Sequence, residues 1–111
     1  MKNSESLKKN KDFQMVYRQR RSQANRLLVM YVRANHLEKN RLGISVSKKV
    51  GNSVVRHRLA RLIRESYRLD EQLFLLGFDI VVIAREQART SSYAEIKEAL
   101  LHLSKLSKVL K

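Results

Sequence analysis

The chain is 111 residues long, 43% hydrophobic and 31% charged, a composition typical of a single globular domain with its own core. It contains no cysteine, which excludes disulfides, zinc–thiolate sites and thiol nucleophiles. Lysine and arginine number 24 against 10 acidic residues, which gives a formal net charge of +14. So basic a chain is attracted to polyanions, first of all nucleic acid and then an anionic membrane surface.

Two segments bear on where the protein acts. The longest apolar run, IVVIA at 80–84, is far shorter than the about 20 residues needed to cross a bilayer. The N-terminal MKNSESLKKNKDF has no apolar signal core. We therefore expect a cytoplasmic protein with no membrane partner. A single domain is expected over residues 1–111, with residues 1–8 loosely ordered.

The first predicted element is a short helix. Asn10 is a candidate N-cap and Asp12 lies in the first turn, where a negative charge suits the helix dipole. Phe13, Val16 and Tyr17 then recur at i, i+3 and i+4, which indicates one aromatic stripe.

Two segments rich in β-formers follow, at 27–34 and 41–49, and the polar turn between them predicts a hairpin. In the second segment Leu42 and Ile44 alternate with Gly43 and Ser45. This alternation predicts one apolar core face and one face of very small side chains.

The pair Gly51-Asn52 predicts a turn and an N-cap for a helix from Val54 to about Leu69. Its predicted apolar stripe comprises Val55, Leu59, Leu62 and Leu69, with Ser66 among them and Ile63 at the edge. Basic side chains occupy an arc of about 120° on the other side, namely His57, Arg58, Arg61, Arg64 and Arg68. Arg56 falls outside that arc.

The remaining chain predicts one more strand and one more helix. The continuous apolar run of GFDIVVIAR (77–85) indicates a buried strand in a central or parallel position. Ser92 and Glu95 form an S-x-x-E capping box at the start of a final helix. The order of these elements predicts an α+β fold, one sheet with helices packed on it.

The usual catalytic motifs are absent from the sequence. The acidic residues are scattered, and His36, His57 and His102 lie in different elements, so each is read as a surface or packing histidine. There is no G-x-S-x-G elbow, no G-x-G-x-x-G and no P-loop. The polypeptide alone therefore shows no self-sufficient active site.

The basic arc favours phosphate binding over a merely solvated helix face. A solvated face usually mixes signs, whereas Arg61 and Arg64 and their neighbours place like charges at i+3 and i+4, which is destabilising. Arginine, the prevalent residue here, suits phosphate with its planar fork. In a helix-turn-helix protein a second helix precedes the recognition helix, whereas here strands precede the basic helix. This arrangement favours RNA binding over DNA binding.

The segment SKKVGNSVVRHRLARLIRE (47–65) resembles the signature S-K-K-x-G-N-x-V-x-R-N-R-x-K-R-x-x-R of the protein subunit of bacterial ribonuclease P. LKKNKDFQMVY, ANRLLVMYV and FDIVVIAR resemble the family's first helix, the strand after it and the strand after the basic helix. This resemblance, over nearly the whole chain, implies an α/β sandwich of order αβββαβα, like one domain of a small-subunit ribosomal protein. It also implies a left-handed crossover through the basic helix, against the general preference.

The resemblance implies a split enzyme. The RNA subunit performs the metal-dependent hydrolysis that removes the 5′ leader of precursor tRNA, and the protein subunit binds the catalytic RNA and that leader. The implied partners are ribonuclease P RNA and precursor tRNA, with no protein partner evident. Mg²⁺ would act through the RNA and substrate, with no protein-only metal site and no catalytic protein residue.

The resemblance also implies two sets of binding residues. Those matched to the catalytic RNA are Lys48, Lys49, Asn52, Arg56, His57, Arg58, Arg61 and Arg64. Those matched to a cleft for the single-stranded leader are Phe13, Tyr17, Tyr31 and Ser45, the first three as its aromatic lining and the last as its floor. Stacking of bases on aromatic rings suits this role, although plain core packing is the alternative for Phe13 and Tyr17.

Two positions depart from the family signature. His57 stands where the family has asparagine, and Ala60 where it has lysine. The first changes which hydrogen bonds the side chain can make, and the second removes one cationic contact.

Two other classes of function remain open: a ribosome-associated RNA-binding protein without a processing role, and a DNA-binding regulator.

Overall fold

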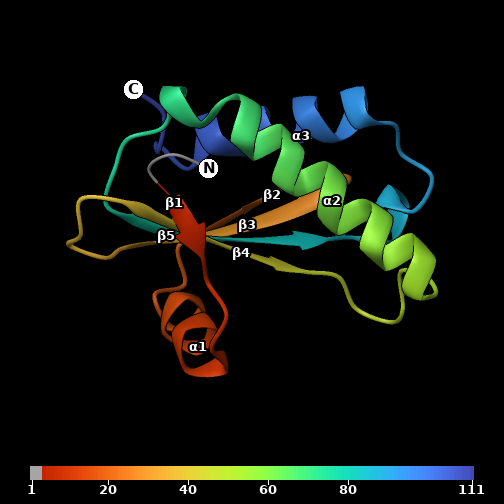
Figure 1. Ribbon diagram of the computed structural model, residues 1–111, viewed down its shortest axis with the longest axis horizontal. Helices are drawn as coiled ribbons and strands as arrows, with labels where there is room; N and C mark the ends of the chain where they lie inside the picture. Colours follow the sequence, from red (N-terminus) through yellow and green to blue (C-terminus); the bar gives the residue numbers. More distant parts are fainter. Residues whose placement is uncertain (1–3) are drawn as a thin grey trace.

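The computed structural model describes residues 4–111, which form a five-stranded sheet with helices on both faces (Figure 1). Strands β1 (Ser4–Ser6), β2 (Ser22–Ala24), β3 (Leu28–Ala34), β4 (Asn40–Ser45) and β5 (Phe78–Ala84) lie in the order β1-β4-β5-β3-β2. Helices α2 (Ser53–Leu69) and α3 (Tyr93–Leu106) cover one face, and α1 (Asn10–Arg18) lies against the other. The predicted α+β class is confirmed. Without β1 and two 3-10 turns, Glu71–Leu73 and Glu86–Ala88, the chain order is αβββαβα.

β5 is the central strand of the sheet. Ile80, Val81 and Val82 are at most 1% exposed, and the strand pairs antiparallel with β3 and parallel with β4. The predicted central or parallel position is therefore confirmed in both respects. The predicted hairpin of residues 27–34 with 41–49 is wrong, because β5 lies between these two strands. The most apolar strand needs cover on both faces, and the centre of the sheet offers that cover.

The N-terminal segment is part of the sheet. Ser4–Ser6 pairs in parallel with residues 40–42 of β4, and the backbone N–H of Leu7 donates to Leu42 O at 2.8 Å. Leu7 is buried, and Ser4 Oγ lies 2.7 Å from Tyr67 Oη. The expectation of loose order is therefore wrong for residues 4–7, whereas residues 1–3 lie outside the described part of the chain. The crossover from β4 through α2 to its parallel neighbour β5 is present, and its left-handedness stays a prediction.

The two faces of the sheet carry two cores of different size. The large one lies under α2 and α3 and includes Leu28, Met30, Leu59, Ile63, Ile80, Ile96 and Leu103. The small one lies under α1 and consists of Leu7, Val16 and Val81, with Phe13, Tyr17, Tyr31 and Ile83 packed against it while partly exposed. In the small core, most of the side chains are therefore both structural and accessible.

The apolar stripe of α2 is rotated from the predicted one. Leu59 and Ile63 are buried as its centre, together with Tyr67, while Leu69 is 44% exposed. Tyr67 can be buried because its hydroxyl meets Ser4 Oγ and, at 3.4 Å, Asn40 Nδ2. The predicted stripe does not include Tyr67, because the two partners of its hydroxyl are distant in sequence.

The predicted caps hold for two of the three helices. Asn52 Oδ1 accepts from Val55 N at 3.0 Å at the start of α2. Ser92 and Glu95 form the complete capping box of α3. The prediction of Asn10 as a cap is wrong, since Lys9 occupies the cap position of α1 without a side-chain bond and Asn10 is the first helical residue.

Candidate nucleic-acid interface

The basic face of α2 is accessible to a partner. His57, Arg58, Arg61 and Arg64 are exposed and, with Val54, line a shallow hollow of about 430 Å³. Arg56 is half-buried on the side of the helix facing β4, as its place outside the predicted arc requires. All five basic residues matched to the catalytic RNA on this helix thus lie on one connected surface.

The loop before α2 brings two more lysines to the same surface. Lys48 and Lys49 are exposed, while Val50 between this pair and the helix is 2% exposed and anchors the turn in the core. Lys48 and Lys49 therefore stand at the N-terminus of α2, where the helix dipole adds to their positive charge. The Oδ1 atom of Asn52 accepts from Val55 N as the helix cap, while its side chain remains exposed.

Countercharge reaches only the far end of the basic face. Glu65 pairs with Arg68, and this hydrogen bond is the main reason why the pKa of Glu65 lies below its ordinary value. Arg68, counted with the unneutralised arc in the sequence, is thus partly neutralised. No acidic side chain of residues 4–111 forms an ion pair with Arg56, Arg61 or Arg64.

On the opposite face of the sheet, three predicted aromatic residues meet. The ring centroids of Phe13 and Tyr17 are 6.4 Å apart, and those of Tyr17 and Tyr31 are 5.0 Å apart, edge to face. All three rings are only half-buried. Burial, and secondarily the neighbouring Tyr31, raise the pKa of Tyr17, so its hydroxyl stays neutral at physiological pH. The three rings therefore contact one another, as predicted, and remain partly exposed.

Cross-strand register explains how Ser45 joins this aromatic group. Alternate residues of β3, β5 and β4 point to the α1 face and form three rows. The rows are Arg33–Asp79–Arg41, Tyr31–Val81–Gly43 and Val29–Ile83–Ser45. Helix α1 packs over the second row, and the third stays half-exposed beside it. Ser45 thus lies in a half-exposed row of the sheet beside α1.

Gly43 provides the seat for Phe13. A Cβ atom at residue 43 would lie 2.7 Å from Phe13 Cζ, closer than such contacts occur. The small-residue face predicted for this strand therefore has a definite use: it lets an aromatic ring of α1 lie directly on the backbone of β4.

Sequence reasoning missed two residues of the half-exposed third row. Val29 and Ile83 are half-exposed neighbours in the third row. The run IVVIA predicts a strand that is buried throughout, whereas Ile83 within it is half-exposed. The exposure of Ile83 follows from the strand register, which requires that β5 lie beside both β3 and β4.

The first row is a charge cluster that no motif predicted. Asp79 is fully buried, accepting from Arg41 Nε at 2.8 Å, Arg41 Nη2 at 2.7 Å and Asn35 Nδ2 at 2.9 Å, while Arg33 Nη1 lies 3.3 Å away. Burial alone would raise the pKa of Asp79, but these hydrogen bonds and charges outweigh it and hold the pKa below its ordinary value. Arg41 also lies 3.6 Å from Asp12, which connects this buried carboxylate to the first turn of α1.

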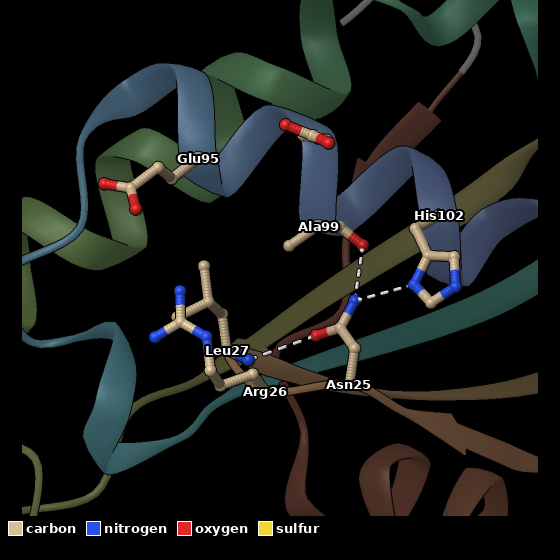
Figure 2. Close-up of a pocket in the computed structure, with 7 residues that line it drawn as sticks. Asn25, Arg26, Leu27, Glu95, Ala99 and His102 are labelled. Carbon is tan, nitrogen blue, oxygen red and sulfur yellow. Dashed lines mark hydrogen bonds between the residues drawn. The ribbon is translucent and has the colours of Figure 1, made fainter.

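A separate hollow of about 290 Å³ lies between the β2–β3 loop and α3 (Figure 2). Asn25 fills a structural role there, since its Nδ2 donates to Ala99 O at 3.0 Å and lies 3.2 Å from His102 Nδ1. Glu95 at its rim is engaged as the α3 cap. The polar groups in this hollow thus fasten a loop to a helix, and His102 is an exposed histidine held by a hydrogen bond.

Two properties of the described residues bear on the expected metal and membrane interactions. Within residues 4–111, no group of three or more His, Asp or Glu side chains is placed to hold a metal ion. None of the helices described has the length and hydrophobicity that a bilayer crossing needs.

Comparison with known proteins gives concordant matches. The family model described as ribonuclease P matches residues 1–108. The chain is 58% identical over 107 residues to the ribonuclease P protein component of Lachnoclostridium phytofermentans, covering 96% of this chain and 92% of that relative. It is 54% identical over 110 residues to the corresponding protein of Alkaliphilus metalliredigens, covering 99% of both.

Solved structures match over the same extent. The ribonuclease P protein of Staphylococcus aureus superposes with a TM-score of 0.88 at 42% identity, covering 96% of this chain and 97% of that one. The protein from Thermotoga maritima superposes with a TM-score of 0.84 at 31% identity, covering 96% and 98%. Sequence and fold therefore agree.

Proposed function

The chain belongs to the family of bacterial ribonuclease P protein components and takes part in tRNA 5′ processing with the ribonuclease P RNA, and from this premise we propose how its surfaces divide that work. The basic face of α2, with Lys48 and Lys49, binds the catalytic RNA. The cleft between α1 and the sheet binds the single-stranded leader of precursor tRNA.

One observation carries this proposal: the two surfaces join at one loop. Ser45, in the half-exposed row beside α1, ends β4, and the chain then passes through Lys48 and Lys49 into the start of α2 (Figure 1). An RNA strand leaving the cleft over Ser45 therefore meets an electropositive surface at once. The protein is thereby suited to hold the leader beside the catalytic RNA.

The chemistry itself is assigned to RNA. The side chains of the basic face are donors and cations, whereas Mg²⁺ takes oxygen ligands. We therefore assign the Mg²⁺ of the reaction to the RNA subunit and substrate, and assign no catalytic residue to the protein. It acts in the cytoplasm, where precursor tRNA is made.

Reconstitution tests the proposal directly. The protein is mixed with ribonuclease P RNA and precursor tRNA at a Mg²⁺ concentration at which the RNA alone is inactive. We expect leader cleavage to be restored, because cationic side chains replace part of the Mg²⁺ that screens RNA repulsion.

Two results would contradict it and identify a rival. RNA binding without restored cleavage would indicate a ribosome-associated protein. Preference for duplex DNA over both RNAs would indicate a DNA-binding regulator. A variant with Arg56, Arg61 and Arg64 changed to alanine serves as the matched negative control.

A further inference from the structure

The side of α2 that faces β4 carries a hollow of about 290 Å³, and we propose that it binds one unpaired base of the catalytic RNA. The inference rests on the proposed function, since it takes that RNA as the partner. It adds a site for a base to a surface otherwise suited to phosphate.

The hollow has an apolar floor and a cationic rim. Ile44, Val46 and Ala60 form the floor, each half-exposed, and Arg56, His57 and Arg64 form the rim. No acidic residue lines it, and no ion pair within residues 4–111 occupies Arg56 or Arg64. The rim is thus free to meet a ligand from outside the chain.

This lining fits a base better than a phosphate alone. An imidazole ring and guanidinium planes are the groups on which splayed RNA bases stack. An aliphatic floor contributes nothing to a phosphate but buries the edge of a base. A phosphate site would need only the exposed arginines, which the neighbouring hollow of Val54, Arg58 and Arg61 already provides.

Ala60 is the residue that opens the hollow. Positions 56, 60 and 64 follow one another at i+4 along the side of α2 facing β4. The family signature has lysine at position 60, and the aliphatic stem of a lysine would lie over Ile44 and Val46. The two departures from the signature therefore complement each other: alanine makes the space, and His57 places a ring at its rim.

The RNA backbone on either side of the base would also be bound. His57 and Arg64 line both this hollow and the one over Arg58 and Arg61. A nucleotide with its base over Ala60 would thus have its flanking phosphates within the basic face, so base and phosphate contacts reinforce one another.

The test is Ala60→Leu, which fills the hollow without changing charge. We expect its affinity for ribonuclease P RNA to fall by about fivefold or more, the loss of one stacked base. The slope of log K against log salt should stay unchanged, because a base contact releases no counterions. Ala94→Leu, at an exposed site in α3, is the matched control and should bind like the parent protein.

The possible results separate the two proposals. Unchanged affinity of Ala60→Leu overturns the base site, and so does a reduced salt slope. If Arg61→Ala also leaves affinity and slope unchanged, the proposed function itself fails. Thermal melts of both leucine variants show whether any loss reflects unfolding.

A second measurement does not depend on substitution. Methyl NMR of the parent protein should show shifts at Ala60 and Ile44 with adenosine 5′-monophosphate and not with inorganic phosphate. Equal shifts with the two ligands, or none with the nucleotide, would overturn the base site.

Discussion

At the scale of single residues, Arg58 and Arg61 are equivalent in the sequence signature but not in the structure. Arg58 Nη2 donates to Ser91 O at 2.5 Å and so ties α2 to the start of α3. Arg61 is exposed and makes no hydrogen bond within residues 4–111. In the proposed interface the first residue therefore serves both fold and binding, and the second serves binding alone.

Alanine substitution should separate these roles. Arg61→Ala should weaken RNA binding and flatten the salt slope by about one unit, because one phosphate contact is lost. Arg58→Ala should do the same and also lower the free energy of unfolding by about 1 kcal/mol, since it removes a hydrogen bond between helices. Salt titrations of binding and urea unfolding measure the two effects.

Arg68→Ala is the control for this pair. Arg68 is already engaged by Glu65, so its loss should change the slope less than the loss of Arg61. An unchanged affinity and slope in Arg61→Ala would show that the basic face is not the RNA interface.

At the scale of elements, helices were predictable because their signals are local. Asn52 as cap, the Ser92–Glu95 box and the arginine arc are all read within one or two turns of chain. Asp79 was not predictable as an anchor, because its partners Asn35 and Arg41 are distant in sequence and become neighbours only through strand pairing. The group of Phe13, Tyr17 and Tyr31 was available from the family resemblance, whereas Val29 and Ile83 required the register.

The position of α1 as an element should control leader binding. Arg41 links the buried Asp79 to Asp12 in the first turn of α1, one residue before Phe13. Asp12→Asn removes that link, so the preference for precursor over mature tRNA should fall about two- to fivefold. Phe13→Ala removes a stacking ring and should reduce it further, by fivefold or more, about the value of one stacked base. Competitive binding of precursor and mature tRNA to the holoenzyme measures both.

Gln14→Ala, on the exposed side of α1, is the matched control and should keep the full preference. An equal loss of affinity for both tRNAs in Phe13→Ala would argue against the cleft as the leader site. Thermal melts exclude unfolding as the cause.

At the scale of the whole molecule, the pairing of strands was the part of the fold that the sequence could not supply. Neighbouring β-segments joined by a polar turn usually pair, but here β5 enters between β3 and β4 from more than thirty residues away. The pattern of apolar residues identified β5 as the most buried strand. Only the assembled sheet shows that β5 lies between β3 and β4 and so prevents their pairing. The same assembly places the two proposed RNA surfaces on opposite faces, joined at the Lys48–Lys49 loop.

The net charge of +14 predicts that salt has opposite effects on two quantities: the Tm of the free protein and its affinity for RNA. Basic side chains on the exposed face of α2 repel one another, and screening relieves this repulsion over the Debye length of about 10 Å at 0.1 M salt. Raising KCl should therefore increase the Tm of the free protein, by about 4 °C or more for each kcal/mol relieved. The RNA complex should lose affinity over the same range, because binding releases counterions. Thermal melts and binding titrations over one KCl series test both signs. A Tm that falls with KCl would mean that the basic face is neutralised within the chain, leaving no unneutralised charge for RNA to pair.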